Sequence, residues 1–157
     1  PQHSIPDTEK IRLAAAWAAA HYFVSIAERD WLFTIGRPAP DIERQLLAGC
    51  YLFITAWNPP PGVQPIEANL AAAERLQARL QQAGLRHHPA LACDANGGAL
   101  ERGWLVLDAP LPWSDALGRD FDQGGTLAWS QGEPVRLRML WSRPAGASDE
   151  AHTDWVG

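Results

Sequence analysis

The amino-acid sequence predicts an α/β fold in which helices pack on a single mixed β-sheet. Two observations indicate this class. Residues 51–57 form a nearly continuous apolar run that stops before three consecutive prolines, as expected of a central strand covered on both faces. Residues 65–84 then carry apolar side chains at helical spacing. Shorter helical and extended patterns surround these two segments, and together they give the order α-ββ-α-β-α-ββ-α-ββ.

Four elements are expected before the central strand. Proline and an acidic residue at Pro6 and Asp7 are typical of the first turn of a helix. Two apolar runs separated by a short charged turn then predict a hairpin. In chain order the elements are a helix ending near residue 20, strands at 21–26 and 31–35 around a turn at 28–30, and a short helix from Asp41 to Gly49.

Six elements are expected from the long helix onward. Asp94–Gly98 has the composition of a hairpin turn, and Gly124 and Gly125 separate the last helix from the strand that follows it. Alternating residues near the end of this region predict an edge strand at 135–141. In chain order the elements are the helix at 65–84, strands at 88–93 and 103–107, a helix at 112–121, and strands at 126–129 and 135–141.

Composition divides the chain into one globular domain at residues 1–142 and a polar, acidic tail at residues 143–157. The tail has the composition of a disordered segment. Two tryptophans flank it, Trp141 and Trp155. They offer two ways of ordering the tail: packing on the domain, or contact with a partner or a second copy of the chain.

Charge and apolar content exclude several classes of function. The net charge is −5, and the basic residues are scattered, whereas a nucleic-acid binder needs clustered cations. No apolar run approaches the ~20 residues needed to cross a bilayer, and no signal peptide is recognisable. Cys50 and Cys93 lie in apolar surroundings and are expected to be reduced, buried thiols, which favours a cytoplasmic location.

No cofactor or metal is predicted, because the sequence has neither a phosphate-binding glycine loop nor a set of ligands at metal-binding spacing. Pro1 stands where a methionine is usual, which suggests a trimmed start. Its secondary amine is chemically competent as a base, although no other residue in the sequence supports that role.

The junction between the central strand and the long helix is the most informative place in the sequence. Asn58 closes the strand, Thr55 precedes it by three residues, and Asn69 lies at the border of the apolar face of the helix. In open α/β sheets the end of a strand and the start of the next helix share one edge, where ligands usually bind. Asn58 and Asn69 are therefore expected to converge. In a purely structural alternative, Asn58 bonds its own turn and Asn69 ties the proline-rich loop to the helix.

Further candidate polar residues lie downstream. Asp94 and Asn96, beside two glycines, are expected to be ordinary turn residues. Glu101 precedes a strand and is expected to be exposed, although a buried position there would suit a general base. Gln123 follows the last predicted helix.

These residues resemble a bacterial family of domains of unknown function. The family has a Thr-Ala-x-Asn-Pro signature, which Thr55–Pro59 matches. Asn69 matches an amide in the following helix, Glu101 an acidic position, and Phe121 and Gln123 a Phe-Gly-Gln motif in which Asp122 replaces the glycine. The resemblance spans Trp17 to Leu140. It supports the predicted fold and adds weight to the Asn58–Asn69 site, but the family implies no known activity.

Three functions from different classes are compatible with the sequence. The first is binding of a small polar or anionic ligand at the Asn58–Asn69 edge, with Thr55, Glu101 and Gln123 as further candidate contacts. The second is a protein–protein interaction or regulatory module, or a homo-oligomer, that uses the tryptophan-containing tail. The third is a hydrolase-like enzyme with Glu101 or Asp94 as general base. The residues alone do not identify the ligand, the reaction or the oligomeric state.

Overall fold

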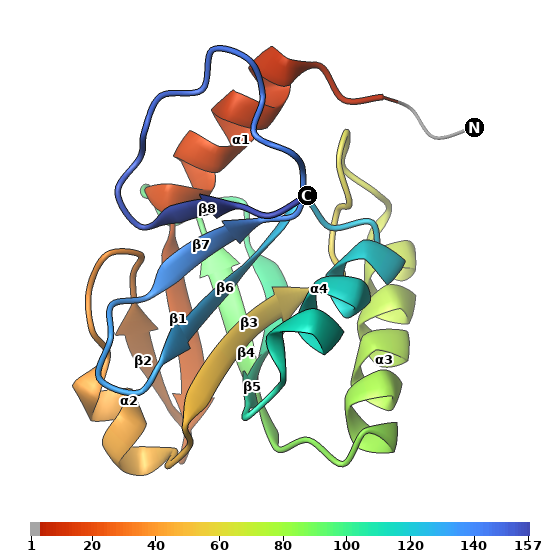
Figure 1. Cartoon of the computed structure of the whole chain (residues 1–157). Helices are drawn as coiled ribbons and strands as arrows, with labels where there is room; N and C mark the ends of the chain where they lie inside the picture. Colours follow the sequence, from red (N-terminus) through yellow and green to blue (C-terminus); the bar gives the residue numbers. More distant parts are fainter. Residues whose placement is uncertain (1–3) are drawn as a thin grey trace.

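The computed structural model describes residues 4–157, so that Pro1 lies outside the described residues. It contains one eight-stranded sheet and four helices (Figure 1). The elements are α1 (Asp7–Ala18), β1 (His21–Ile26), β2 (Arg29–Phe33), α2 (Pro40–Gln45), β3 (Cys50–Thr55), α3 (Ile66–Gln82), β4 (His87–Cys93), β5 (Glu101–Leu107), α4 (Leu111–Asp120), β6 (Gly125–Ser130), β7 (Arg136–Met139) and β8 (Thr153–Trp155).

The predicted α/β class, the mixed sheet and the order of the first eleven elements are confirmed. The strands lie in the order β2-β1-β4-β5-β3-β6-β7-β8, and every neighbouring pair is antiparallel except β7 with β8. An isolated parallel bridge joins Ile35, just after β2, to Val135, just before β7. The sheet is therefore curled, with segments from its two ends in contact (Figure 1).

The curled sheet has a core on each side. Inside the curl, Phe33 of β2 lies 6.1 Å from Phe53 of β3 and 5.5 Å from Trp129 of β6, measured between ring centroids. Strand β2 is a sheet neighbour of neither β3 nor β6, so the Phe33 ring meets the other two rings across the concave interior. On the outer face, Leu76 and Leu80 of α3 are fully buried in a cluster that also holds residues of β3, β5 and α4. Helices α3 and α4 lie side by side on that face (Figure 1).

The first hairpin turns earlier than the sequence predicts. Its turn consists of Ala27 and Glu28, which both have positive φ, and β2 begins at Arg29. Two consecutive residues in this conformation form the tight turn that suits antiparallel strands. The usual sequence signal for such a turn is Asn-Gly or Asp-Gly, and its absence here is why the prediction placed the turn and the second strand about two residues too late.

The C-terminal segment contributes an eighth strand. β8 pairs with β7, so the segment predicted as an edge strand at 135–141 is not at the edge of the sheet. Trp155 packs against the interior core, and the ring of Trp141 stacks on Trp17 at 6.3 Å. Of the two ways of ordering the tail, the structure shows packing on the domain. The polar composition of this segment indicated disorder. Its order comes instead from a strand of only three residues and from the packing of Trp155, which composition does not reveal.

Neither predicted thiol forms a disulfide: Cys93 is buried and Cys50 is half-buried. None of the helices within residues 4–157 combines the length and apolar character that crossing a bilayer requires.

We predict that Trp155→Ala lowers the free energy of unfolding by about 1–2 kcal/mol, because it removes a half-buried ring from the interior core. Denaturant unfolding followed by circular dichroism measures the change. Asp149→Ala is the matched control in the same segment, since its side chain is 96% exposed, and it should change stability by less than about 0.5 kcal/mol. Equal stability of the Trp155 variant and the wild type would contradict the packing role.

Candidate functional site

The site begins at the corner where β3 ends. The Thr55 hydroxyl donates to the Arg102 carbonyl at 2.5 Å and accepts the Trp57 backbone N–H at 3.1 Å. This side chain therefore takes over backbone pairing where the strand stops. Asn58 follows in a left-handed backbone conformation, with φ of 45°. Asparagine tolerates that conformation better than most residues, which explains its position before the proline loop.

Asn58 and Asn69 converge, as the sequence predicts. The backbone N–H of Asn58 donates to Asn69 Oδ1 at 2.9 Å, and Asn69 Nδ2 donates back to Asn58 Oδ1 at 2.8 Å. Asn69 is only 2% exposed, so these bonds are formed away from water. The pair ties the end of β3 to the first turns of α3. The same bonds are those of the structural alternative, in which Asn69 ties the proline-rich loop to the helix.

Asn58 also reaches two further groups. Its Oδ1 accepts the backbone N–H of Gln64 at 2.9 Å, which fixes the far end of the proline loop. Its Nδ2 donates to Glu101 Oε2 at 3.0 Å. One side chain therefore connects a strand end, a loop, a helix and the first residue of β5.

Glu101 is not exposed, contrary to the sequence-based expectation. It is half-buried, and burial raises the pKa of its carboxyl group, while the hydrogen bond from Asn58 lowers it in part. Within the described residues no Lys, Arg or His side chain forms an ion pair with this carboxylate. Its position follows from the pairing of β5 with β4, which places Glu101 opposite Ala92 near the interior of the curl. The pairing register of β4 and β5 could not be predicted from the sequence.

Glu101 lines a small cavity inside the curled sheet. The cavity has a volume of about 50 Å³, room for roughly one or two waters. Thr126 is 2% exposed, and its hydroxyl has no hydrogen-bond partner. The lining consists of aromatic, small and polar side chains, namely Trp17, Tyr22, Phe53, Thr55, Ala92, Glu101, Gln123, Gly125, Thr126, Leu127 and Leu137.

Gln123 connects this cavity to the corner and to the surface. Its Nε2 donates to the Trp57 carbonyl at 3.3 Å, next to Asn58. Gln123 also lines an outer groove of about 620 Å³ together with Pro59, Gln64 and Arg119. It thus lies between the interior cavity and solvent-facing space.

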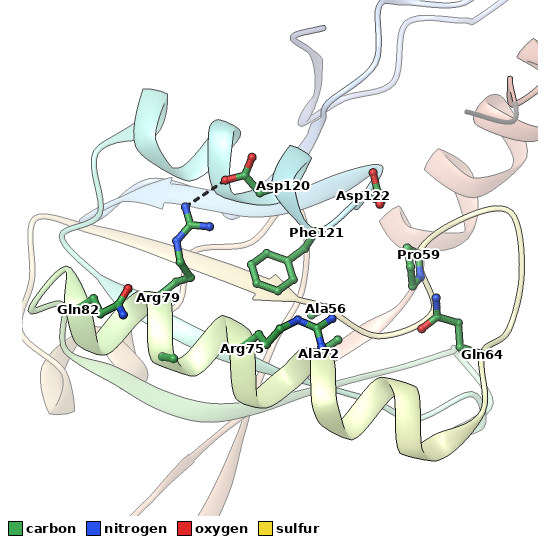
Figure 2. Close-up of a pocket in the computed structure, with 11 residues that line it drawn as sticks. Ala56, Pro59, Gln64, Ala72, Arg75, Arg79, Gln82, Asp120, Phe121 and Asp122 are labelled. Atoms are coloured by element: carbon green, nitrogen blue, oxygen red, sulfur yellow. Dashed lines mark hydrogen bonds and ion pairs between the residues drawn. The ribbon is translucent and has the colours of Figure 1, made fainter. Parts of the chain in front are cut away.

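A second groove of about 510 Å³ runs between α3 and α4 (Figure 2). Arg79 forms an ion pair with Asp120 across it at 3.0 Å. The side chain of Arg75 extends along α3 toward Ala56, and Asp122 lies near Pro59, away from the Arg79–Asp120 pair (Figure 2). Two arginines and two aspartates therefore share this groove.

The structure brings together five of the residues singled out in the sequence, namely Thr55, Asn58, Asn69, Glu101 and Gln123, and leaves Asp94 and Asn96 apart. The Asp94 carboxylate accepts the backbone N–H groups of Asn96 and Gly98 at 2.9 Å each, as expected of a turn residue. Sequence reasoning missed Thr126 and Tyr22. A single threonine in the otherwise apolar run from 126 to 129 was the available signal for the first.

Residues 54–125 match the family described as "Protein of unknown function (DUF3293)", which confirms the resemblance to a family of uncharacterised domains. All five converging residues lie within the matched segment. The curated proteins and the solved structures contain no match to this chain. The site's chemistry must therefore be argued from its own geometry.

We predict that Asn69→Ala lowers the free energy of unfolding by about 2–3 kcal/mol, because it removes two buried hydrogen bonds and leaves the Asn58 N–H without its acceptor. Urea unfolding is the measurement. Glu74→Ala, at an exposed position of the same helix, is the control and should stay within about 0.5 kcal/mol of wild type. A loss no larger than that of the control would show that the amide pair contributes nothing to stability.

We predict a pH-dependent difference between wild type and Glu101→Gln. A carboxyl group whose folded-state pKa is raised binds more protons in the folded than in the unfolded chain, so its contribution to stability falls as pH rises from the unfolded to the folded pKa. Glutamine removes that contribution and retains an acceptor for Asn58. The stability of Glu101→Gln relative to wild type should therefore increase over this pH range.

Urea unfolding of both chains between pH 4 and pH 8 measures the difference. Glu74→Gln, which removes an exposed carboxylate of α3, is measured in parallel as the control. A stability difference between Glu101→Gln and wild type that falls as pH rises would contradict the raised pKa.

Proposed function

We propose that this protein binds a small polar ligand in the interior cavity beside the Asn58–Asn69 corner. In this proposal Glu101 and Gln123 contact the ligand, Thr55 contributes to the wall, and Asn58 and Asn69 are positioning residues. The amide pair holds the Asn58 side chain, and Asn58 in turn orients the Glu101 carboxylate.

The observation that carries the proposal is a half-buried carboxylate with unused hydrogen-bonding capacity next to an unpartnered hydroxyl. Glu101 accepts one hydrogen bond, through Oε2, and Thr126 has none. A buried polar group without a partner costs free energy, so a ligand that bonds the Thr126 hydroxyl and the free oxygen of Glu101 would offset that cost.

A polar ligand is favoured over an anionic one. A carboxylate in the lining disfavours a second negative charge in so small a cavity. The groove between α3 and α4 offers Arg75 and Arg79 to an anion, but Asp120 and Asp122 in the same groove offset that charge.

Catalysis is the second candidate function, and one observation favours it. A raised pKa brings a carboxyl group closer to the range in which it transfers protons at neutral pH, and Glu101 is such a group. Asp94, the other candidate base, is an exposed turn residue whose carboxylate bonds its own backbone and lies outside the cavity lining. The interaction-module hypothesis is weakened, since Trp141 and Trp155 pack against the chain's own core.

We predict that a small hydrogen-bonding compound raises the melting temperature of the wild-type chain, because a ligand that binds only the folded state stabilises it. The measurement is a thermal-shift screen of small amines, amides, alcohols, sugars, carboxylates and phosphate. A compound that acts on the cavity should lose most of its effect in Glu101→Gln and keep it in Glu74→Gln. A screen in which every effective compound stabilises both variants equally would contradict the proposed site.

A further inference from the structure

Resting on the proposed function above, we infer that the cavity receives a cationic nitrogen group, of the kind carried by a primary alkylamine. The inference comes from the hydrogen-bonding roles that the lining residues have left, together with the aromatic walls and the size of the space.

The polar atoms left free in the cavity lining are mainly acceptors. Glu101 Oε2 accepts one hydrogen bond from Asn58, which leaves Oε1 without a described partner. Gln123 Nε2 already donates to backbone carbonyls of Trp57 and Phe121, so the remaining group of that amide is its carbonyl oxygen. The Tyr22 hydroxyl donates to the Trp17 carbonyl at 2.7 Å and keeps only its acceptor capacity.

The Thr126 hydroxyl is the one lining group free to act in either role, and it is buried without a partner. A ligand rich in acceptors would find few donors here. An ammonium group carries three N–H donors and no acceptor, which is the complement of a carboxylate, a carboxamide oxygen and two hydroxyl oxygens. It would also supply the positive partner that Glu101 lacks among residues 4–157.

The apolar part of the lining points to the same class. The rings of Trp17, Tyr22 and Phe53 form walls of the cavity. Aromatic rings attract cations through their negative faces, and the attraction is strongest where water is excluded. A volume of about 50 Å³ admits a head group of a few heavy atoms and excludes a sugar or a nucleobase.

The rest of such a ligand has a path to the outside. Gln123 lines both the cavity and the outer groove that Pro59, Gln64 and Arg119 border. An amine whose nitrogen lies beside Glu101 can therefore carry a longer substituent past Gln123 into that groove. The cavity therefore limits the size of the amine head group, and the groove receives the substituent.

The test is an NMR titration of the full chain with methylammonium chloride, using potassium chloride at equal ionic strength, ethanol and sodium acetate as comparison probes. The signals followed are the Thr126 backbone amide, the Gln123 side-chain amide and the carboxyl carbon of Glu101. We expect saturable shifts with methylammonium and a lower Glu101 pKa in its presence. Glu101 and Tyr22 are the two residues of the cavity lining with ionisable side chains.

Two variants and a control complete the test. Glu101→Gln should weaken methylammonium binding at least tenfold, and Thr126→Val, which keeps the shape of the side chain, should weaken it several-fold. Glu74→Gln, on the exposed side of α3, should leave it unchanged. The dispersion of the amide spectrum shows whether each variant is folded. If Glu101→Gln does not fold, the isosteric Thr126→Val variant still tests the inference.

The outcomes separate this inference from the proposed function. If ethanol or acetate shifts the cavity signals as well as methylammonium does, the cation inference is wrong and the cavity remains a binding site. If Glu101→Gln and Thr126→Val both bind methylammonium as wild type does, or potassium chloride reproduces the shifts, the inference is also wrong. If no probe in this titration or in the thermal-shift screen affects the cavity, the proposed function fails with it.

Discussion

The reciprocal hydrogen bonds between Asn58 and Asn69 are the interaction on which the site depends. Asn58 lies at the end of a buried strand in a left-handed conformation, and its backbone N–H has no strand partner there. Asn69 supplies that partner from α3 and in return donates to the Asn58 side chain. Because the Asn58 amide is fixed in this way, its nitrogen is directed at Glu101. Strand end, helix and acidic side chain are therefore held as one unit.

The curl of the sheet supplies the second constraint, because it creates an interior in which a cavity can exist. The close approach of β3 and β5 at Gly103 contributes to this geometry. A Cβ atom at that position would lie 2.6 Å from the Ile54 carbonyl oxygen and 3.0 Å from the Phe53 ring. Only glycine fits so near the backbone. Phe53 can then reach the rings of Tyr22 and Phe33 across the concave side.

Sequence reasoning predicted what depends on local pattern. The order of helices and strands followed from apolar periodicity, and the meeting of Asn58 with Asn69 followed from a strand end, a helix face and a spacing of eleven residues. The burial of Glu101 could not be predicted in this way, because it depends on how β5 pairs with strands far away in the chain. Strand β8 was missed for a similar reason: it is three residues long, and its pairing with β7 outweighs its polar composition.

Asp122 stands where the sequence resemblance leads one to expect glycine, and the backbone conformation there explains why aspartate is tolerated. The residue occupies a left-handed conformation with φ of 54°, directly before Gln123. Glycine adopts that conformation without steric cost, and aspartate is among the few other residues that tolerate it. Asp122 therefore supports the backbone turn from which the Gln123 amide reaches the Trp57 carbonyl.

A glutamate at position 101 disfavours the folded state when its carboxyl group is charged. Burial disfavours its charged form, and a single hydrogen bond from Asn58 offsets only part of that penalty. Glutamine would accept the same bond without the charge, so stability alone does not account for a carboxylate here. Residues that violate local stability rules without compensation inside the chain concentrate at functional sites. The carboxylate, the unpartnered Thr126 hydroxyl and the cavity between them occupy one small region of an otherwise apolar interior, and that coincidence is the physical reason to place the function there.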